Sequence, residues 1–377
     1  MKKRSLGLYL HIPFCLSKCR YCDFCSFPAV SAERKHAYTV ALAHELRAMA
    51  ALAEGYIVDT VFFGGGTPTC LDTADLLLLA DCIRLHYCLS EDVEWTSEAN
   101  PATIDAEKLR TMREGGFNRI SLGMQSAADN ELALLGRAHR TPDLYRAAAA
   151  IREAGYTSWN LDLMFGIPAQ TVESFGHSLD EAIGLAPTHL SVYSLQIEEG
   201  TPFYRERATL ALPGEEEERE MAALLYRKTA ENGYRRYEIS NFAKPGFESR
   251  HNLRYWRMKD YLGFGIAAHS CFGGKRFYNR EALDEYIRQP LSLREQEEML
   301  TAREREYETV MLGLRLCDGI AEKEFADAFG YGFFEAYGQR MQRFVDAGFA
   351  YFDGEKTHLT ESGMAVSNAI LAEILED

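Results

Sequence analysis

The first half of the chain alternates short apolar runs with longer stretches whose apolar residues recur at helical spacing. Short apolar runs bounded by turn residues predict buried strands, and the amphipathic stretches between them predict helices. The predicted strands cover residues 6–12, 57–63, 93–99, 118–123, 157–164 and 189–195. The predicted helices cover residues 32–54, 72–87, 106–114 and 172–183, with a further helix that begins at Thr141 and Pro142.

Six strands that alternate with helices predict an α/β fold with a parallel sheet and crossover helices. Six units are too few for a closed eight-stranded barrel, so we expect an open, partial parallel β/α barrel. In such folds the functional site lies at the carboxyl ends of the strands. After residue 202 the alternation ends, and residues 234–242 predict an edge strand.

The pattern changes again from about residue 291, where helices dominate. A short hairpin is predicted around residues 349–358, and Thr360 is a predicted cap of the last helix. Three helices with a hairpin predict a small, helical, winged-helix-like C-terminal domain. We therefore expect a partial barrel over residues 1–285 and a C-terminal helical domain over residues 286–377.

Composition and charge exclude some classes of function. The chain has 377 residues, enough for two domains, and its net charge of −15 argues against nucleic acid as a partner. The basic start and its apolar run are interrupted by His11 and Pro13, so the run is too short for a signal peptide. The densest aliphatic run, residues 76–80, is too short to span a bilayer. These features predict a cytoplasmic protein that is not an integral membrane protein.

Cys15, Cys19 and Cys22 follow the first predicted strand, with three and then two residues between them. Thiolates at this spacing can hold a polynuclear iron–sulfur cluster from one loop. Three thiolates leave one iron of a four-iron cluster open for chemistry, although Cys25 is an alternative fourth ligand. A structural zinc site needs a second ligand pair, which the sequence lacks, and nine cysteines do not suit a disulfide framework.

Further polar and glycine residues follow the other predicted strands. The three glycines and Thr67 within residues 64–67 expose backbone groups, either in a plain tight turn or beside a ligand. Glu98 and Asp162 can accept hydrogen bonds from an amine or from ribose hydroxyls, and Arg137 can pair with a carboxylate. Each residue alone also fits a surface charge. Beside an open iron, the set predicts a site for S-adenosylmethionine.

The cysteine motif, with Tyr21 before its last cysteine, resembles the signature of the radical S-adenosylmethionine (radical SAM) superfamily, and residues 64–68 resemble the glycine motif of that superfamily. Residues 11–15, 98–101, 238–242 and 251–256 resemble motifs of the oxygen-independent coproporphyrinogen III dehydrogenase group. Within that group the chain is most similar to the heme-chaperone (HemW) branch. The resemblance extends over essentially the whole chain, including residues 359–363 near its end.

The resemblance implies cofactors and the residues that hold them. The three cysteines would hold a 4Fe-4S cluster, S-adenosylmethionine would bind its fourth iron, and an electron donor would reduce the cluster. The positions that align with ligand-contact residues of the dehydrogenase are Tyr9, Tyr21, Gly65, Gly66, Thr67, Glu98, Gln125, Arg137, Asp162 and Gln196.

His251 begins the sequence His-Asn-x2-Tyr-Trp, a motif that in the chaperone branch is implicated in heme binding. A neutral imidazole is a natural axial ligand of heme iron, and Tyr255 and Trp256 would offer flat apolar surface to the porphyrin. The alternative is a histidine whose hydrogen bonds are satisfied within its own loop. The resemblance also implies a heme-acceptor protein, for which a membrane cytochrome is a candidate.

Two features of the sequence favour the chaperone branch over the dehydrogenase. The dehydrogenase carries a longer segment before the cluster and a fourth cysteine two residues after the third, whereas here Phe24 holds that position and Cys25 follows it. We therefore expect a heme chaperone that transfers heme, with no catalytic residue assigned. The alternatives are the dehydrogenase itself and a radical enzyme that opens or methylates heme. Cys25 remains open between an incidental thiol, a cluster ligand and a heme ligand.

Overall fold

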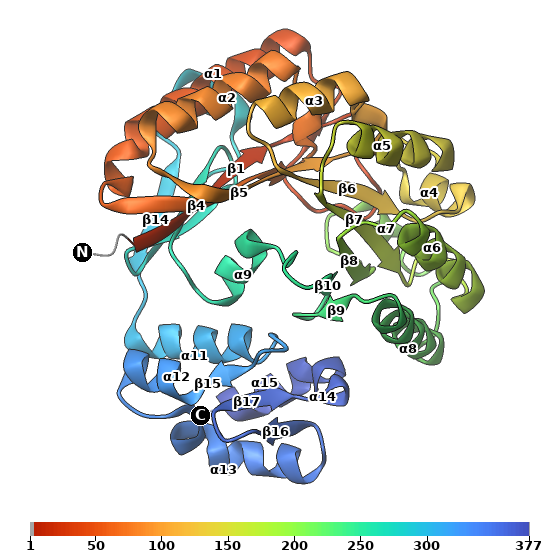
Figure 1. Cartoon of the computed structure of the whole chain (residues 1–377), viewed down its shortest axis with the longest axis vertical. Helices are drawn as coiled ribbons and strands as arrows, with labels where there is room; N and C mark the ends of the chain where they lie inside the picture. The colour runs from red at the N-terminus through yellow and green to blue at the C-terminus, as the bar shows by residue number, and fades with distance from the viewer. Residues whose placement is uncertain (1–3, 377) are drawn as a thin grey trace.

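The computed structural model of the chain describes residues 4–376, and its main body is one open sheet of twelve strands (Figure 1). The strand order is β14-β13-β12-β11-β1-β4-β5-β6-β7-β8-β10-β9. The predicted parallel strands form its centre: β1 (Arg4–Ile12), β4 (Tyr56–Gly65), β5 (Leu89–Ala99), β6 (Arg119–Gln125), β7 (Ser158–Phe165) and β8 (His189–Ser194). The predicted open β/α barrel is confirmed.

The helices that connect these strands cover the convex face of the sheet (Figure 1). The predicted helix over residues 32–54 ends early, because its last residues form a separate 3-10 turn, Ala50–Ala53. The connecting helices are α1 (Ala32–Met49), α2 (Thr73–His86), α3 (Ala106–Glu114), α4 (Asp129–Leu135), α5 (Thr141–Glu153) and α6 (Val172–Gly184). Two further helices, α7 (Pro202–Glu206) and α8 (Glu215–Glu231), follow β8. In the part of the chain described, no helix is long and apolar enough to cross a membrane.

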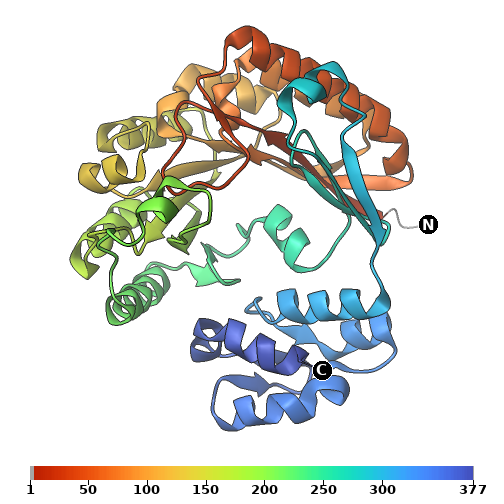
Figure 2. The same ribbon diagram turned by 180° about the vertical axis from the view of Figure 1, so that it is seen from behind.

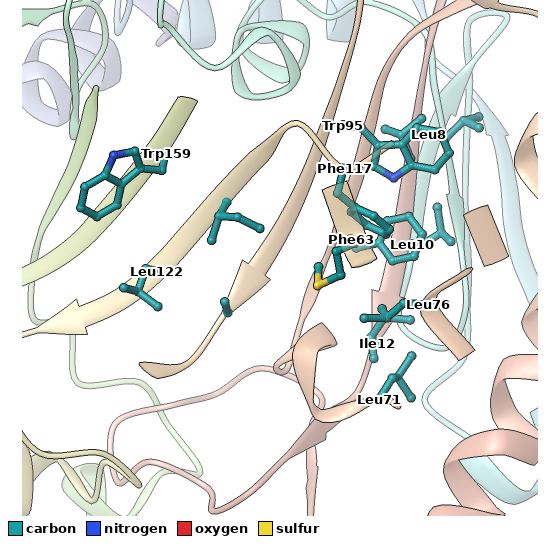
Figure 3. Close-up of a cluster of buried hydrophobic side chains, with 14 of the residues drawn as sticks. Leu8, Leu10, Ile12, Phe63, Leu71, Leu76, Trp95, Phe117, Leu122 and Trp159 are labelled. Carbon is teal, nitrogen blue, oxygen red and sulfur yellow. The ribbon is translucent and has the colours of Figure 1, made fainter. Parts of the chain in front are cut away.

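The helices on the convex face of the sheet cover the central strands. The apolar side chains of these strands therefore form the core. Leu8, Leu10 and Ile12 of β1 have no exposed surface. Figure 3 shows them beside Phe63 and Phe117, whose ring centroids lie 4.9 Å apart in an edge-to-face arrangement. Burial of each such side chain contributes about 1.5–3 kcal/mol. This core fixes the strands whose carboxyl ends carry the candidate site.

On the side of β1 away from β4, the sheet continues through four strands that the sequence did not predict. β11 (Tyr261–Phe264) pairs parallel to β1, and β12 (His269–Phe272), β13 (Lys275–Asn279) and β14 (Arg294–Met299) follow in antiparallel order. The sheet thus reaches beyond residue 285, and the division of the chain predicted there stays a prediction. The short helix α9 (Arg250–Trp256) packs against β4, and α10 (Leu283–Arg288) packs against α1.

At the other edge, the single strand predicted over residues 234–242 is two short strands, β9 (Arg235–Arg236) and β10 (Asn241–Ala243). Glu238 lies between them, and its carboxylate accepts hydrogen bonds from the Ser240 N–H at 2.8 Å and from the side chain of Asn241. These bonds turn the chain, so β10 pairs antiparallel with β8 while β9 lies outside it.

The C-terminal part has a hydrophobic cluster of its own and lies on the open side of the curved sheet (Figures 1 and 2). Thr360 caps a helix there as predicted, because its hydroxyl accepts the Gly363 N–H at 3.1 Å, but this helix ends at Ala365 and a separate last helix begins at Ser367. The helices are α11 (Ala302–Gly313), α12 (Glu322–Phe329), α13 (Phe333–Asp346), α14 (Glu361–Ala365) and α15 (Ser367–Leu375). The strands β15 (Ile320–Ala321), β16 (Ala350–Phe352) and β17 (Lys356–Leu359) form a small sheet.

Candidate functional site

The cysteine loop is held at the carboxyl end of β1. Two short parallel strands, β2 (Phe14–Cys15) and β3 (Phe27–Pro28), close the loop at its base. Cys15, Cys19 and Cys22 all line one cavity of about 400 Å³, which we call the cluster cavity. Three thiols that line one cavity are the type of donor that an iron–sulfur cluster requires, although no group of three His, Cys, Asp or Glu side chains among the described residues is placed to hold a single metal ion.

Two of these thiols, those of Cys15 and Cys22, lie in an environment that opposes loss of the proton. Burial raises the pKa of Cys15, and it raises the pKa of Cys22 to about 11. Metal ions bind thiolates, and a bound metal itself favours loss of the proton. The Thr67 hydroxyl lies 3.8 Å from the Cys15 Sγ and can donate to it, which favours the thiolate further.

Arg137 reaches into the cluster cavity from the segment after α4. Its Nη2 donates to the carbonyl oxygen of Gly123 at 2.9 Å, and its Nη1 lies 3.5 Å from the Cys19 Sγ. Its Nε is buried and has no hydrogen-bond partner within residues 4–376. A buried donor without a partner costs about 1–3 kcal/mol, which an acceptor on a ligand would relieve. The orphaned Nε therefore fits a ligand that carries a carboxylate.

The glycine turn after β4 joins the cysteine loop to Glu98. Gly65 has a φ of +107°, a conformation that favours glycine, and its N–H donates to the Glu98 carboxylate at 3.1 Å. A Cβ on Gly66 would lie 2.8 Å from the carbonyl oxygen of Phe14 and 2.9 Å from that of Ile12. The two glycines are thus required by the fold as well as exposed to the cavity.

Glu98 and Asp162 give the far wall of the cavity its acidic groups. Burial and the charge of Asp162 raise the pKa of Glu98 to about 8, although the Gly65 N–H opposes this shift. Burial also raises the pKa of Asp162, which accepts a hydrogen bond from Asn160 Nδ2 at 2.6 Å. A cationic ligand would lower both pKa values, so this wall suits an ammonium or sulfonium group.

Gln125 ends β6 in a strained backbone conformation, with a φ of +66°. A left-handed backbone is uncommon for a residue other than glycine and occurs often at functional sites. The sheet register also shifts between Gly123 and Gln125, which directs the end of β6 toward the cavity.

Most of the site residues predicted from the sequence come together. The following line the cluster cavity: Cys15, Cys19, Tyr21, Cys22, Gly65, Gly66, Thr67, Glu98, Gln125, Arg137 and Asp162. Tyr9 lines a neighbouring cavity instead. Gln196 is exposed and lies among the lining residues of neither cavity. Its contact with the cosubstrate stays a prediction.

His251 is buried among protein groups and has only 1% of its surface exposed. Its Nδ1 hydrogen-bonds to the Thr60 hydroxyl at 2.9 Å and its Nε2 to the Tyr255 hydroxyl at 2.8 Å. Burial lowers the pKa of His251 to about 3, so the ring is neutral. Both nitrogens are occupied, and this geometry does not support an iron ligand. The heme-ligand role of His251 stays a prediction.

A second cavity of about 510 Å³ adjoins the cluster cavity, and the two share Phe24, Gly65 and Glu98. Cys25 lines the second cavity and is absent from the lining of the first. The remaining side chains around it are Tyr9, His11, Asp23, Tyr255, Tyr261, Ala267, His269 and Glu281. Cys25 therefore belongs to a different space from the three cluster cysteines.

Several residues of the cluster cavity escaped the sequence analysis, among them Ser121, Gly123 and Tyr193. Side chains two residues apart on a strand share a face. Counting back by two from Gln125 on β6 reaches Gly123 and Ser121. That periodicity was the signal that could have found Gly123 and Ser121.

An open β/α sheet with a three-cysteine loop at the carboxyl end of its first strand defines the class of radical SAM proteins. Residues 9–182 match the family model of the radical SAM superfamily, and residues 300–366 match that of the HemN C-terminal domain. A radical SAM domain implies a 4Fe-4S cluster and S-adenosylmethionine, and the three thiols of one cavity and the orphaned Arg137 Nε suit these two groups.

Relatives over nearly the whole chain narrow this class. A heme chaperone HemW from Bacillus subtilis is 36% identical over 97% of this chain and 98% of its own length. A HemW from Lactococcus lactis is 31% identical over 100% of this chain and 99% of its own length. A HemW from Escherichia coli is 41% identical over 71% of this chain and 71% of its own length. The chain belongs to the HemW family of heme chaperones within the radical SAM superfamily.

A solved structure supports the same fold. Coproporphyrinogen III oxidase (HemN) from Escherichia coli, described as a radical SAM enzyme, superimposes with a TM-score of 0.87 at 25% identity. The match covers 99% of this chain and 90% of that protein. The fold is thus common to a heme chaperone family and a porphyrinogen-oxidising enzyme, and function must be argued from the site.

Proposed function

We propose that this protein is a cytoplasmic heme chaperone, which binds heme and transfers it unaltered to an acceptor protein. The observation that carries the proposal is the similarity over nearly the full length to relatives named heme chaperones. The position of Cys25 supports it, because a fourth cysteine outside the cluster cavity differs from the arrangement expected of the dehydrogenase. A membrane cytochrome is a suitable class of acceptor.

In this proposal the cluster cavity holds the resident cofactors. Cys15, Cys19 and Cys22 would bind the 4Fe-4S cluster, Arg137 would pair with the carboxylate of S-adenosylmethionine, and the acidic wall would face its cationic groups. A reduced cluster supplies the electron that cleaves S-adenosylmethionine, and an external donor must provide that electron. The protein's own residues bind and orient the cosubstrate, and the buried core behind them excludes water.

The rival function is oxidative decarboxylation of coproporphyrinogen III. One observation favours it: besides the cysteines, the cluster cavity carries most of the residues that align with the cosubstrate contacts of the dehydrogenase, and the solved dehydrogenase shares the fold. A carrier has no evident need for this machinery. A radical enzyme that opens or methylates heme would use the same cavity.

Heme transfer is the direct test of the proposed function. The heme-loaded protein is mixed, without S-adenosylmethionine, with an excess of a heme-free b-type cytochrome, and the cytochrome spectrum is followed. We expect one heme per chain and appearance of the holo-cytochrome as the loaded chain loses its heme. Failure to bind heme at a saturable site, or transfer no faster than that from serum albumin, would exclude the chaperone function.

A further inference from the structure

The second cavity lies beside the cosubstrate site and has no role in the function described so far. Its lining residues differ from those of the cluster cavity. We infer that this cavity is where the heme cargo binds, with the Cys25 Sγ as a ligand of the iron. The inference rests on the proposed function and adds a location and a ligand to it. Four features carry it: the position of Cys25, the aromatic walls, the charges around the thiol and the hydrogen bonds of His251.

The position of Cys25 is fixed by the backbone of the cysteine loop. His11 Nε2 donates to the carbonyl oxygen of Cys25 at 2.9 Å, and His11 Nδ1 accepts from the Tyr9 hydroxyl at 3.0 Å. Both His11 and Tyr9 line the second cavity. The loop is therefore anchored to β1 at the point where the Cys25 side chain faces this cavity.

Four of the residues that line the second cavity are aromatic: Tyr9, Phe24, Tyr255 and Tyr261. Tyr255 and Tyr261 pack edge to face with centroids 4.6 Å apart, and Tyr9 and Phe24 line the space with them. Phe24 is 63% exposed and so leaves apolar ring surface free for a ligand to cover. A flat apolar macrocycle gains from contact with aromatic rings and would cover Phe24.

The thiol of Cys25 has a base beside it. Burial and the charge of Glu281 raise the pKa of Cys25 to about 12, and the thiol hydrogen-bonds to the Glu281 carboxylate. When ferric heme binds, the S–H bond breaks, an Fe–S bond forms, and water leaves the iron. The proton passes to Glu281 and from there to solvent, and the iron stays ferric. Thiolate is an established axial ligand of heme iron.

The charges around this cavity set the orientation of the cargo. Asp23 and Glu281 are both exposed and line this cavity, where they would repel the heme propionates. Lys18 lines the adjoining cluster cavity, and its Nζ donates at 3.0 Å to the carbonyl oxygen of Phe24, a residue that both cavities share. The propionates would therefore point away from the two carboxylates and toward Lys18, with the apolar part of the ring between the aromatic side chains.

His251 acts on this cavity through Tyr255 rather than by contact with iron. Its Nε2 holds the Tyr255 hydroxyl at 2.8 Å, and Tyr255 lines the cavity while His251 does not. His251 is therefore a positioning residue, which keeps an aromatic wall in place. Its loss should weaken heme binding without changing the atoms bound to iron.

Titration of the full chain with ferric heme, read by the position and amplitude of the Soret band, tests these assignments. We expect Cys25→Ser to shift the Soret maximum and weaken binding at least tenfold. Cys25→His should restore affinity with an imidazole-type spectrum. His251→Ala should weaken binding several-fold while the Soret maximum stays at the wild-type position. Cys82→Ser, a half-buried cysteine that lines neither cavity, is the matched control.

The outcomes separate the inference from the function on which it rests. If the wild type binds no heme, the proposed function fails. If the wild type binds heme and Cys25→Ser has the same Soret band and affinity, the chaperone proposal stands and the assignment of Cys25 is wrong. If His251→Ala or His269→Ala shifts the Soret band and Cys25→Ser does not, the ligand of the heme iron is an imidazole and not the Cys25 thiolate. Cluster content and circular dichroism of each variant distinguish loss of a ligand from loss of fold.

Discussion

At the scale of single residues, the site depends on charged groups held in a low-dielectric space. Glu98 shows this most clearly, because burial and Asp162 raise its pKa from 4.5 to about 8. A carboxyl group with a raised pKa binds more protons in the folded state than in the unfolded state. It therefore stabilises the fold at low pH, and this contribution is lost as the pH rises toward 8.

We predict that Glu98→Gln flattens this pH dependence in the protein without cofactors. Between pH 4.5 and 8 the wild type should lose stability by less than about 1.4 kcal/mol per pH unit from this group, the value for one full proton. The variant should lose less over the same range, as measured by urea unfolding at several pH values. Glu107→Gln, on the exposed face of α3, is the control. Parallel pH profiles for wild type and Glu98→Gln would contradict the raised pKa.

The cysteines give a second prediction at this scale. Alanine at Cys15, Cys19 or Cys22 should abolish the brown chromophore after anaerobic reconstitution, because each thiol lines the cluster cavity. Cys25→Ala should keep full iron and sulfide content, because Cys25 lines the other cavity. Iron and sulfide analysis of each variant measures its cluster content. Loss of the cluster in Cys25→Ala equal to that in Cys22→Ala would show that four thiolates hold it.

The residues that were predictable from the sequence are those whose partners are local or follow a strand end. The cysteine spacing is contained in one loop, and Glu98 ends a strand that its apolar run had located. One partner of His251, Thr60, was not predictable, because it lies 191 residues away in sequence, whereas Tyr255 lies within the same motif. The contact of α9 with β4 shows that both imidazole nitrogens are satisfied.

At the scale of elements, the glycine turn after β4 is the contact between the sheet and the cysteine loop. Gly66 donates its N–H to the carbonyl oxygen of Ile12 at 2.9 Å, and Thr67 donates its N–H to that of Phe14 at 2.8 Å. These bonds bring two backbones too close for a side chain. The turn is therefore part of the fold as well as of the site.

We predict that Gly66→Ala destabilises the protein by about 1–3 kcal/mol, the usual cost of overpacking, and lowers the cluster content with it. The matched control is Gly184→Ala at the end of α6, where a Cβ meets no atom within 4 Å. That change should be neutral or stabilising by up to about 1 kcal/mol. Thermal unfolding compares the two. An unchanged melting temperature for Gly66→Ala would contradict the prediction, because it would mean that the two backbones can move apart to make room for the added Cβ.

The central strands and most of the helices between them were predictable from their apolar period, whereas the short helix α4 was not predicted. The strands β11 to β14 were not, because they are short and their region is rich in aromatic and glycine residues. Gly263 on β11 illustrates the cause: a Cβ there would lie 2.1 Å from the carbonyl oxygen of His269. Close contact between neighbouring chain segments, rather than an alternating pattern, determines this edge of the sheet.

At the scale of the whole molecule, two hydrophobic clusters divide the chain. The larger cluster reaches Leu293 and the C-terminal cluster begins at Val310. The sequence predicted two domains but placed the division at residue 285, before a strand that pairs within the large sheet. The break between the clusters favours a division close to residue 300.

Truncation tests this division. A chain ending at residue 300 should fold and reconstitute a cluster, because it keeps every strand of the large sheet. A chain ending at residue 285 lacks β14 and Leu293, exposes the edge of β13, and should be less stable and prone to aggregation. Size-exclusion chromatography and urea unfolding compare the two. Equal stability of both chains would support the division at residue 285.

The central claim is that this radical SAM scaffold carries a porphyrin without changing it. The measurement that tests it most directly is mass spectrometry of the porphyrins after anaerobic incubation of the reconstituted, reduced protein with S-adenosylmethionine and either coproporphyrinogen III or heme. We expect both to be recovered at their original masses, with heme in a one-to-one complex. Protoporphyrinogen IX formed at many turnovers per chain would contradict the claim and identify a dehydrogenase. Methylated or ring-opened heme would identify a heme-modifying enzyme.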